Sequence, residues 1–306
     1  RGPLYSAPED DGPPMTDFMT TKEVAAYLRI KERRVYELVR QRAIPCTRVT
    51  GKWLFPRTLI DLWLADKVEG ERPKQALPPV IAGSHDPLLE WAVRESGCGL
   101  ALMSGGSLDG LKRFAEGGAV AAGLHLFDAE TGDFNVPTVA GTFPALGAVL
   151  IEWARRRQGL VLAAGNPQGV TRLKDLKDKS VRVVRRQPEA GSYLLLAHLL
   201  EGEGLTVEDL ECAEETARSE TDLGLAILEG RAEAGFAVEA VARTLKLEFL
   251  PLMEERYDLL MRRRDYFEGP MQALLAFARG EVFGNRVEQM GGYDVSGLGT
   301  VRFNGP

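Results

Sequence analysis

Near the start of the chain, apolar positions recur at helical spacing in two short segments, residues 22–28 and 32 to about 42. In the second segment Val35, Leu38 and Val39 share one face, and mostly charged residues occupy the other. Only three residues separate the two segments, so the pattern predicts a helix-turn-helix. Thr20 or Thr21 precedes the first helix and is expected to cap it.

An extended pattern follows the second helix. Residues 47–49 and 52–55 flank Thr50 and Gly51, which is typical of a hairpin with a tight turn. Such a hairpin forms a wing beside the two helices. Pro56 is expected to end the wing, and Thr58 to cap a last helix over residues 59–64.

From residue 80 onward, short apolar runs alternate with helical patterns. Strands are expected at 80–82, 99–103, 119–124, 180–184 and 234–236, and helices at 86–95, 108–116, 191–201, 223–230 and 238–245. This alternation predicts an α/β fold with a largely parallel sheet. Two long segments, 148–164 and 248–263, are predicted to be long strands that join two lobes around a ligand cleft.

These patterns divide the chain into four parts. Residues 1–17 are rich in Pro, Gly and Asp and are expected to form a disordered leader, followed by a helix-turn-helix module over 18–67. Residues 68–79 contain three prolines and predict a linker. The effector domain then covers 80–306, with lobe I at about 80–147 and 258–306 and lobe II at about 148–257.

Composition narrows the class of protein. The chain has 306 residues, 44% hydrophobic and 27% charged, as in globular proteins. It has no apolar run long enough to span a membrane, so we expect no membrane partner. Cys46, Cys98 and Cys212 are far apart and lack metal-ligand spacing, which favours reduced thiols in a bacterial-type cytoplasm and predicts neither disulfide nor metal.

Charge is distributed unevenly. Residues 18–67 hold eleven basic and five acidic residues, a net charge of +6. Because the whole chain has a net charge of −6, the remaining residues together carry −12. A basic module on an acidic body indicates a polyanionic partner for the module alone, although a solvated charged surface would give the same count.

Catalytic signatures are missing from the sequence. It contains no Walker A loop and no GxSxG motif, and Gly105-Gly106 lacks the spacing of a dinucleotide fingerprint. It offers no pair of nucleophile and base, so we expect a protein that is not an enzyme and needs no cofactor.

Residues 20–25, 34–36 and 44–45, with Gly51-Lys52-Trp53 and Phe55-Pro56, resemble the excisionase-type, MerR-like winged helix-turn-helix family over about 48 residues. The resemblance implies binding of double-stranded DNA as a homodimer on two half-sites. It implies that Arg33, Arg34 and Tyr36 lie in or beside the major groove, with Arg40 facing it, solvent or phosphate. Arg48 and Lys52 near the tip of the wing are candidate phosphate contacts.

The effector domain carries a second resemblance, on residues 84–89, 104–111, 122–126, 135–137, 164–167, 186–188, 254–259 and 291–294. It resembles the type II periplasmic-binding-protein fold, in the molybdate-binding-like subgroup fused to such DNA-binding modules in cytoplasmic bacterial regulators. The fold class implied is α/β, an N-terminal winged helix-turn-helix followed by a two-lobed binding-protein-like α/β domain.

Three serines stand at expected strand-to-helix turns of the effector domain: Ser84, Ser107 and Ser192. Helix N-termini and neutral hydroxyls bind tetrahedral oxyanions well, and Gly106 would let the backbone approach a ligand closely. Alternatively, each serine caps its own helix. In this fold ligands bind at the carboxyl ends of the strands, which favours a shared site.

The family usually has a Gly/Ser-rich turn ending in Thr-Arg after the motif at 186–188, where this chain has Glu189 to Tyr193. Tyr193 could donate its hydroxyl to an oxyanion or stack on an organic ligand such as a pterin. Gln187, Gly191, Glu239 and Tyr257 are further ligand candidates implied by the resemblance, whereas His85 and His125 are expected to be local hydrogen-bonding partners.

Together these features predict a ligand-responsive bacterial transcriptional regulator that senses molybdate, tungstate or a related oxyanion. The alternative is a sensor or carrier of a metal oxyanion or molybdenum cofactor that does not bind DNA and whose basic module docks a protein.

Overall fold

The computed structural model describes residues 18–49, 52–66, 77–143 and 146–305. The chain divides into two compact units, one up to Arg72 and the other from Pro73. The expected leader, the turn residues 50–51 and most of the expected linker lie outside the described residues. No helix in the described ranges is long and apolar enough to cross a membrane.

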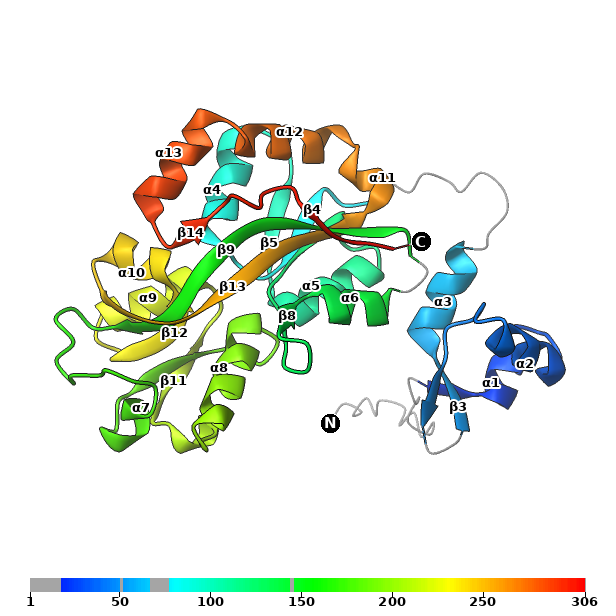
Figure 1. Cartoon of the computed structure of the whole chain (residues 1–306), viewed down its shortest axis with the longest axis horizontal. Helices are drawn as coiled ribbons and strands as arrows, with labels where there is room; N and C mark the ends of the chain where they lie inside the picture. Colours follow the sequence, from blue (N-terminus) through cyan, green and yellow to red (C-terminus); the bar gives the residue numbers. More distant parts are fainter. Residues whose placement is uncertain (1–17, 50–51, 67–76, 144–145, 306) are drawn as a thin grey trace, which may run out of the picture. The chain divides into compact units, whose positions relative to one another are not determined.

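The N-terminal unit is a small winged helix-turn-helix (Figure 1). Its elements are β1 (Phe18–Thr20), α1 (Thr21–Tyr27), α2 (Glu32–Arg40), β2 (Thr47–Val49), β3 (Lys52–Pro56) and α3 (Arg57–Asp66). The three strands form an antiparallel sheet in the order β1-β3-β2. Strand β1 was not predicted, because three residues are too few to show a periodicity.

Local capping explains where α1 begins. The Thr20 side chain accepts a hydrogen bond from the Glu23 amide at 3.3 Å, and the Glu23 carboxylate accepts one from the Thr20 amide at 2.7 Å. This reciprocal pair satisfies two backbone donors that the first turn leaves free. The prediction that Thr58 caps α3 is wrong: β3 runs through Pro56 directly into a helix that starts at Arg57, which places Thr58 inside the first turn.

The core of this unit is small but closed. Val24, Val35, Phe55 and Ile60 are fully buried and bring α1, α2, β3 and α3 together. Val35 lies on the face of α2 opposite its charged residues, as the sequence pattern predicts.

The second unit is built on one mixed sheet. Its strands are β4 (Val80–Gly83), β5 (Ala101–Ser104), β6 (Ala121–Leu124), β9 (Ala148–Leu162), β10 (Val183–Arg186), β11 (Cys212–Ala217), β12 (Ala234–Val238), β13 (Glu248–Arg262), β14 (Tyr293–Asp294) and β15 (Val301–Asn304). The order is β11-β10-β12-β9-β13-β6-β4-β5, and β14 and β15 both pair with β9. A separate two-stranded sheet joins β7 (Phe127–Asp128) to β8 (Asp133–Phe134).

Helices cover this sheet. They are α4 (Pro87–Ser96), α5 (Ser107–Ala115), α6 (Val136–Thr142), α7 (Asp175–Asp178), α8 (Gly191–Gly202), α9 (Glu220–Leu228), α10 (Glu239–Leu245), α11 (Arg263–Tyr266), α12 (Gly269–Ala278) and α13 (Glu281–Met290), with a 3₁₀ turn at Val207–Asp209. Strands β4, β5 and β6 run parallel, as do β10, β11 and β12, whereas the long strands β9 and β13 run antiparallel to each other. The predicted α/β architecture is confirmed.

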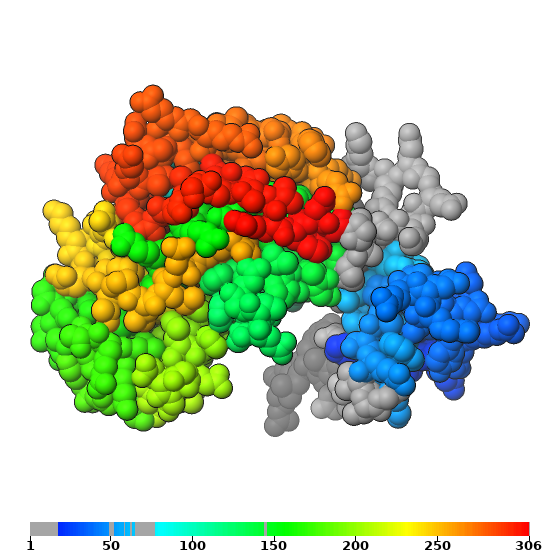
Figure 2. Space-filling model, in the orientation of Figure 1, coloured from blue at the N-terminus to red at the C-terminus, as the bar shows by residue number. Residues whose placement is uncertain are grey.

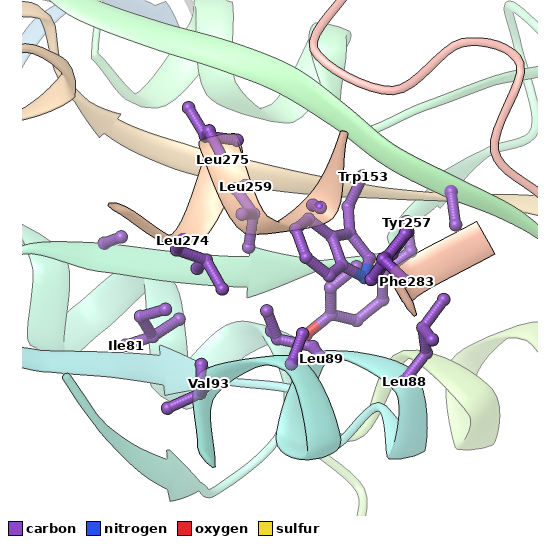
Figure 3. Packing of buried hydrophobic residues seen from close by; sticks show 14 of the residues in the cluster. Ile81, Leu88, Leu89, Val93, Trp153, Tyr257, Leu259, Leu274, Leu275 and Phe283 are labelled. Atoms are coloured by element: carbon purple, nitrogen blue, oxygen red, sulfur yellow. The ribbon is translucent and has the colours of Figure 1, made fainter. Parts of the chain in front are cut away.

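Two large groups of buried residues pack against different parts of the sheet. One surrounds Trp153, Tyr257 and Phe283, where the sheet meets α4, α12 and α13 (Figure 3). The other surrounds Leu160, Leu196 and Phe236, where the sheet meets α8. In Figure 2 the segment after α13, drawn in red, lies over the green strand β9, in agreement with the pairing of β14 and β15 with that strand.

Candidate ligand cleft and nucleic-acid interface

The three serines of the expected cleft do not cap helices. Helix α4 is capped by Asp86, whose carboxylate accepts the Leu89 amide at 2.6 Å, and Pro87 takes the first helical position, where a missing N–H is tolerated. The caps of α5 and α8 are Gly106 and Ala190. The prediction that Ser107 caps α5 is wrong, because Gly106 takes the non-helical cap conformation at φ 101° and leaves Ser107 as the first helical residue.

Instead, two of these serines meet in a buried row. Ser84 follows β4, and its Oγ lies 2.9 Å from Ser107 Oγ and 2.9 Å from His125 Nε2. On the far side of the ring, His125 Nδ1 lies 2.8 Å from the Glu255 carboxylate, and the His125 amide donates to Ser107 Oγ at 3.2 Å. The strand order β13-β6-β4 brings these residues together, since each lies on or just after one of these strands or at the start of α5.

The row continues from Glu255 to a buried guanidinium, that of Arg156. Arg156 on β9 pairs with Glu255 and, at 2.9 Å, with Asp86, and Tyr293 donates to the same Asp86 oxygen at 2.8 Å. Burial alone would raise the pKa of the Glu255 carboxyl, but the charge of Arg156 and the hydrogen bonds from His125 and Arg156 outweigh burial and hold the pKa below its ordinary value. Burial lowers the pKa of Arg156, and Glu255 and Asp86 reverse that effect. Both partners are therefore charged.

Tyr257 contacts two members of the row, Arg156 and Ser84. Its ring lies under the Arg156 guanidinium, 4.4 Å from Cζ to the ring centroid, and its hydroxyl donates to the Ser84 carbonyl at 2.6 Å. The side chain is completely buried. In this state Tyr257 holds the Ser84 backbone in place.

The two lobes touch across this row. The Leu108 amide at the start of α5 donates to the Glu189 carbonyl at 3.2 Å, and the Glu220 amide at the start of α9 donates to His85 Nδ1 at 3.3 Å. Gly106 lies so close to Glu189 that a Cβ atom would come within 2.6 Å of its carbonyl oxygen. The structure therefore shows a closed cleft whose walls meet at glycines.

The third serine comes from the opposite lobe. Ser192 is 1% exposed, and its Oγ has no hydrogen-bond partner among the residues that the structure describes. It follows Gly191, which packs against the His125 ring at the start of α8. Buried hydroxyls are almost always hydrogen-bonded, so an unpaired one at this position is available to a ligand.

The remaining ligand candidates have partners elsewhere. Gln187 donates to the Arg218 carbonyl at 3.4 Å, and the half-buried Tyr193 packs on the apolar core of lobe II. Glu239 pairs with Arg157 at 2.7 Å and with Arg243 at 2.9 Å. Of the nine ligand candidates, the structure thus brings Ser84, Ser107, Gly106, Gly191 and Tyr257 together around His125. Gln187, Tyr193 and Glu239 make their contacts elsewhere, and the Ser192 hydroxyl has no partner among the described residues.

Four residues of the row were not nominated from the sequence as ligand candidates: Asp86, His125, Arg156 and Glu255. A signal for two of them was present. Arg155-Arg156-Arg157 and Glu254-Glu255-Arg256 place charges at consecutive positions of strands that are otherwise apolar, so one residue of each run has to face inward.

The N-terminal unit presents its charged helix face to solvent. The side chains of Arg33 and Arg34 are 90% and 55% exposed, and both lie near the Glu37 carboxylate, at 3.5 and 2.9 Å. Tyr36 and Arg40 are also exposed on α2. On the wing, the Arg48 guanidinium lies 5.4 Å from the Trp53 ring centroid, and Lys52 is exposed. All six expected DNA contacts are therefore accessible.

Comparison with known families agrees with both folds. The model of a helix-turn-helix domain matches residues 18–68, and the model of the PBP superfamily domain matches residues 89–279, more than half of the chain. The chain belongs to the PBP superfamily. Its PBP superfamily domain follows a DNA-binding domain, and the two matches together support a DNA-binding regulator that binds a ligand.

Individual relatives are distant. The uncharacterized protein YvgK of Bacillus subtilis is 25% identical over 94% of this chain and 98% of its own length. Among solved structures, a protein assigned as a phosphate ABC transporter substrate-binding protein, from Clostridium perfringens with bound phosphate, aligns with a TM-score of 0.52 at 13% identity. That alignment covers 69% of this chain and 96% of the other, and shows that the domain has the PBP superfamily fold.

A tungstate ABC transporter structure from Geobacter sulfurreducens aligns with a TM-score of 0.49 and 12% identity over 68% of this chain and 97% of its own.

Proposed function

We propose that this protein is a bacterial transcriptional regulator that binds double-stranded DNA through its helix-turn-helix and senses a tetrahedral oxyanion, with molybdate and tungstate as the leading candidates. The oxyanion binds between Ser84 and Ser107 of lobe I and Ser192 of lobe II. The protein acts in the cytoplasm, where DNA is accessible, and as a homodimer, since one small module contacts too few bases for tight specific binding.

The ligand class rests on two observations: the Ser192 hydroxyl of lobe II is buried and unpaired among the described residues, and the hydroxyls of Ser84 and Ser107 lie together in lobe I beside His125, on which the neighbouring Gly191 packs. Each of these serines stands at or just before a helix start, where backbone N–H groups and the helix dipole favour an anion. Neutral hydroxyls and amides give many donors within a small volume, which suits a compact oxyanion with four acceptor oxygens. None of the three serine side chains is committed to capping its own helix.

Closure supplies the link to DNA. A ligand that contacts both lobes binds the closed state more tightly than the open one, and it can shift the equilibrium only by that difference in affinity. We propose that the closed lobes change how the dimer presents its two α2 helices.

Thermal unfolding of the full chain with molybdate, tungstate, sulfate or phosphate tests the ligand class. An oxyanion that binds the folded state raises the midpoint in proportion to the logarithm of its concentration. Ser192→Ala should reduce the effect, and Ser180→Ala, outside the cleft, should leave it unchanged. Equal midpoints with and without every oxyanion would refute the oxyanion assignment, while leaving the DNA-binding proposal in place.

Fluorescence anisotropy with the DNA upstream of the protein's own coding region tests the regulator. The double variant R48A/K52A should weaken binding and flatten the dependence on salt, because each lost phosphate contact lowers the slope of log K against log salt by about 0.9. Arg264→Ala is the matched control, an arginine of the effector domain that is 62% exposed. Weak, salt-insensitive binding by the unmodified chain would instead favour a module that docks a protein.

A further inference from the structure

The buried row that contains the two lobe I serines also contains a histidine whose proton position can be assigned. Glu255 is ionised, so its oxygens only accept hydrogen bonds, and His125 Nδ1 beside it has to carry a proton. The other ring nitrogen, Nε2, faces Ser84 Oγ at 2.9 Å. Whether Nε2 accepts or donates there depends only on whether His125 is neutral or protonated.

When His125 is neutral, the Ser84 hydroxyl proton points to the histidine and not into the cleft. Nε2 then accepts the Ser84 hydroxyl proton, and Ser84 Oγ turns lone pairs toward a ligand and toward Ser107. Ser107 Oγ already accepts the His125 amide, so its single proton goes either to Ser84 or to the ligand. At most one of the two hydroxyls can donate to an oxyanion.

Protonation of His125 reverses the first bond. Nε2–H donates to Ser84 Oγ, and the Ser84 hydroxyl proton becomes free to point into the cleft beside that of Ser107. The same proton neutralises the excess negative charge of the buried row, which holds two carboxylates, Asp86 and Glu255, and one guanidinium, Arg156. A dianion entering a row with a net charge of −1 is repelled, and a protonated histidine removes that excess.

We propose, building on the oxyanion site described above, that His125 takes up one proton from solvent when a tetrahedral dianion binds to Ser84, Ser107 and Ser192. The site then holds the dianion as a proton-coupled complex in which both lobe I hydroxyls donate. His125 is thus a positioning residue, since it acts on the ligand through Ser84.

The groups facing His125 come from every element packed on it. Glu255 and Tyr257 belong to β13, Arg156 to β9, Asp86 to the cap of α4 and Ser107 to α5, while α8 contributes Gly191; Tyr293 on β14 reaches the row through Asp86. His85 is a separate case. Its Nδ1 accepts the Glu220 amide and its Nε2 lies 3.0 Å from Glu90, so it has no bond to the serines.

Calorimetric titration of the full chain with molybdate, which stays a dianion between about pH 6 and pH 9, tests the proposal. Paired buffers of different ionisation enthalpy measure the protons taken up. We expect proton uptake on molybdate binding and an association constant that falls as pH rises, because the complex binds one more proton than the free protein. His125→Gln, whose amide donates to Ser84 without titrating, should bind with no uptake and little pH dependence. His198→Gln, on the exposed side of α8, should behave as the wild type.

The outcomes separate the two proposals. Molybdate binding without proton uptake, or with the same uptake in His125→Gln, overturns the role of His125 and leaves the oxyanion site standing. No binding of molybdate, tungstate or sulfate overturns the ligand class and the role of His125 with it. Side-chain ¹⁵N NMR of the three histidines in the unmodified chain asks the same question without a variant: binding should shift the Nε2 resonance of His125 to that of an imidazolium, and an unchanged resonance refutes the proposal.

Discussion

Gly191 offers a way to separate closure of the cleft from folding of the domain. It is the first residue of α8, and a Cβ atom there would lie 2.8 Å from the His125 carbonyl oxygen and 2.9 Å from Nε2, both in the opposite lobe. Its φ lies outside the left-handed region, so alanine fits its own backbone. The three atoms nearest to the added Cβ all belong to His125, so Gly191→Ala obstructs the contact between the lobes.

Gly191→Ala should lower oxyanion affinity without lowering the free energy of unfolding. Ordinary contacts at these atoms need roughly 3.4 Å, so the closed lobes have to separate by about half an ångström. Such overpacking costs about 1–3 kcal/mol. Because that cost falls on the closed state alone, oxyanion affinity should drop about 5- to 150-fold. Alanine in a helix is favoured over glycine by up to about 1 kcal/mol, so the free energy of unfolding should stay equal or rise slightly.

Gly202→Ala is the matched control, because it makes the same substitution at the last residue of the same helix, where a Cβ atom meets nothing within 4 Å. Urea unfolding and molybdate titration of both variants give the two free energies. Hydrogen exchange adds a measurement without ligand: in Gly191→Ala the amides of Leu108 and Glu220, which donate across the cleft, should exchange faster. If Gly191→Ala matched Gly202→Ala in both affinity and exchange, the contact of α8 with His125 would not govern closure.

Three further substitutions test individual bonds. Tyr257→Phe leaves the buried Ser84 carbonyl without its donor and should lower the free energy of unfolding in urea by about 1–3 kcal/mol; an unchanged value would show that another donor replaces the hydroxyl. Burial raises the pKa of Asp258 to about 6 despite Arg256 beside it, so the folded state binds this proton more tightly than the unfolded state. Stability relative to Asp258→Asn should therefore increase by at most about 3 kcal/mol as pH falls from about 7 to 4, and a decrease over that range would refute the assignment. Thr20→Ala removes the reciprocal cap of α1 and should destabilise the N-terminal unit by about 0.5–2 kcal/mol, seen as faster amide exchange in α1 with none in α4.

Local chemistry made part of the fold predictable. The Asp86-Pro87 start of α4 follows from adjacent residues, and the wing follows from two short extended runs around a Gly turn. The long strands β9 and β13 were predicted because two long segments interrupt the alternation of short strands and helices, and each forms a strand of fifteen residues. The helices α11 to α13 were not predicted: residues 258–306 were assigned to lobe I, but no helix or strand was proposed after residue 263.

The buried row could not be predicted, because it depends on strand order. His125 lies 41 residues from Ser84 and 130 from Glu255, and only the adjacency of β4, β6 and β13 brings them into contact. The expected cap at Ser107 failed for a related reason: Glu189 of the other lobe approaches so closely that only a glycine fits at the cap, and that glycine is Gly106.

The way lobe I is assembled has a consequence for synthesis of the protein. Its core joins residues from Ile81 onward to Met271, Phe283 and Met290, which leave the ribosome some two hundred residues later. The helix-turn-helix, complete by Asp66, can fold long before that, since domains generally fold as units in the order in which they emerge. A chain interrupted before α12 would therefore carry a folded helix-turn-helix with an incomplete lobe I, and the proposed effector would have no complete cleft through which to act on that module.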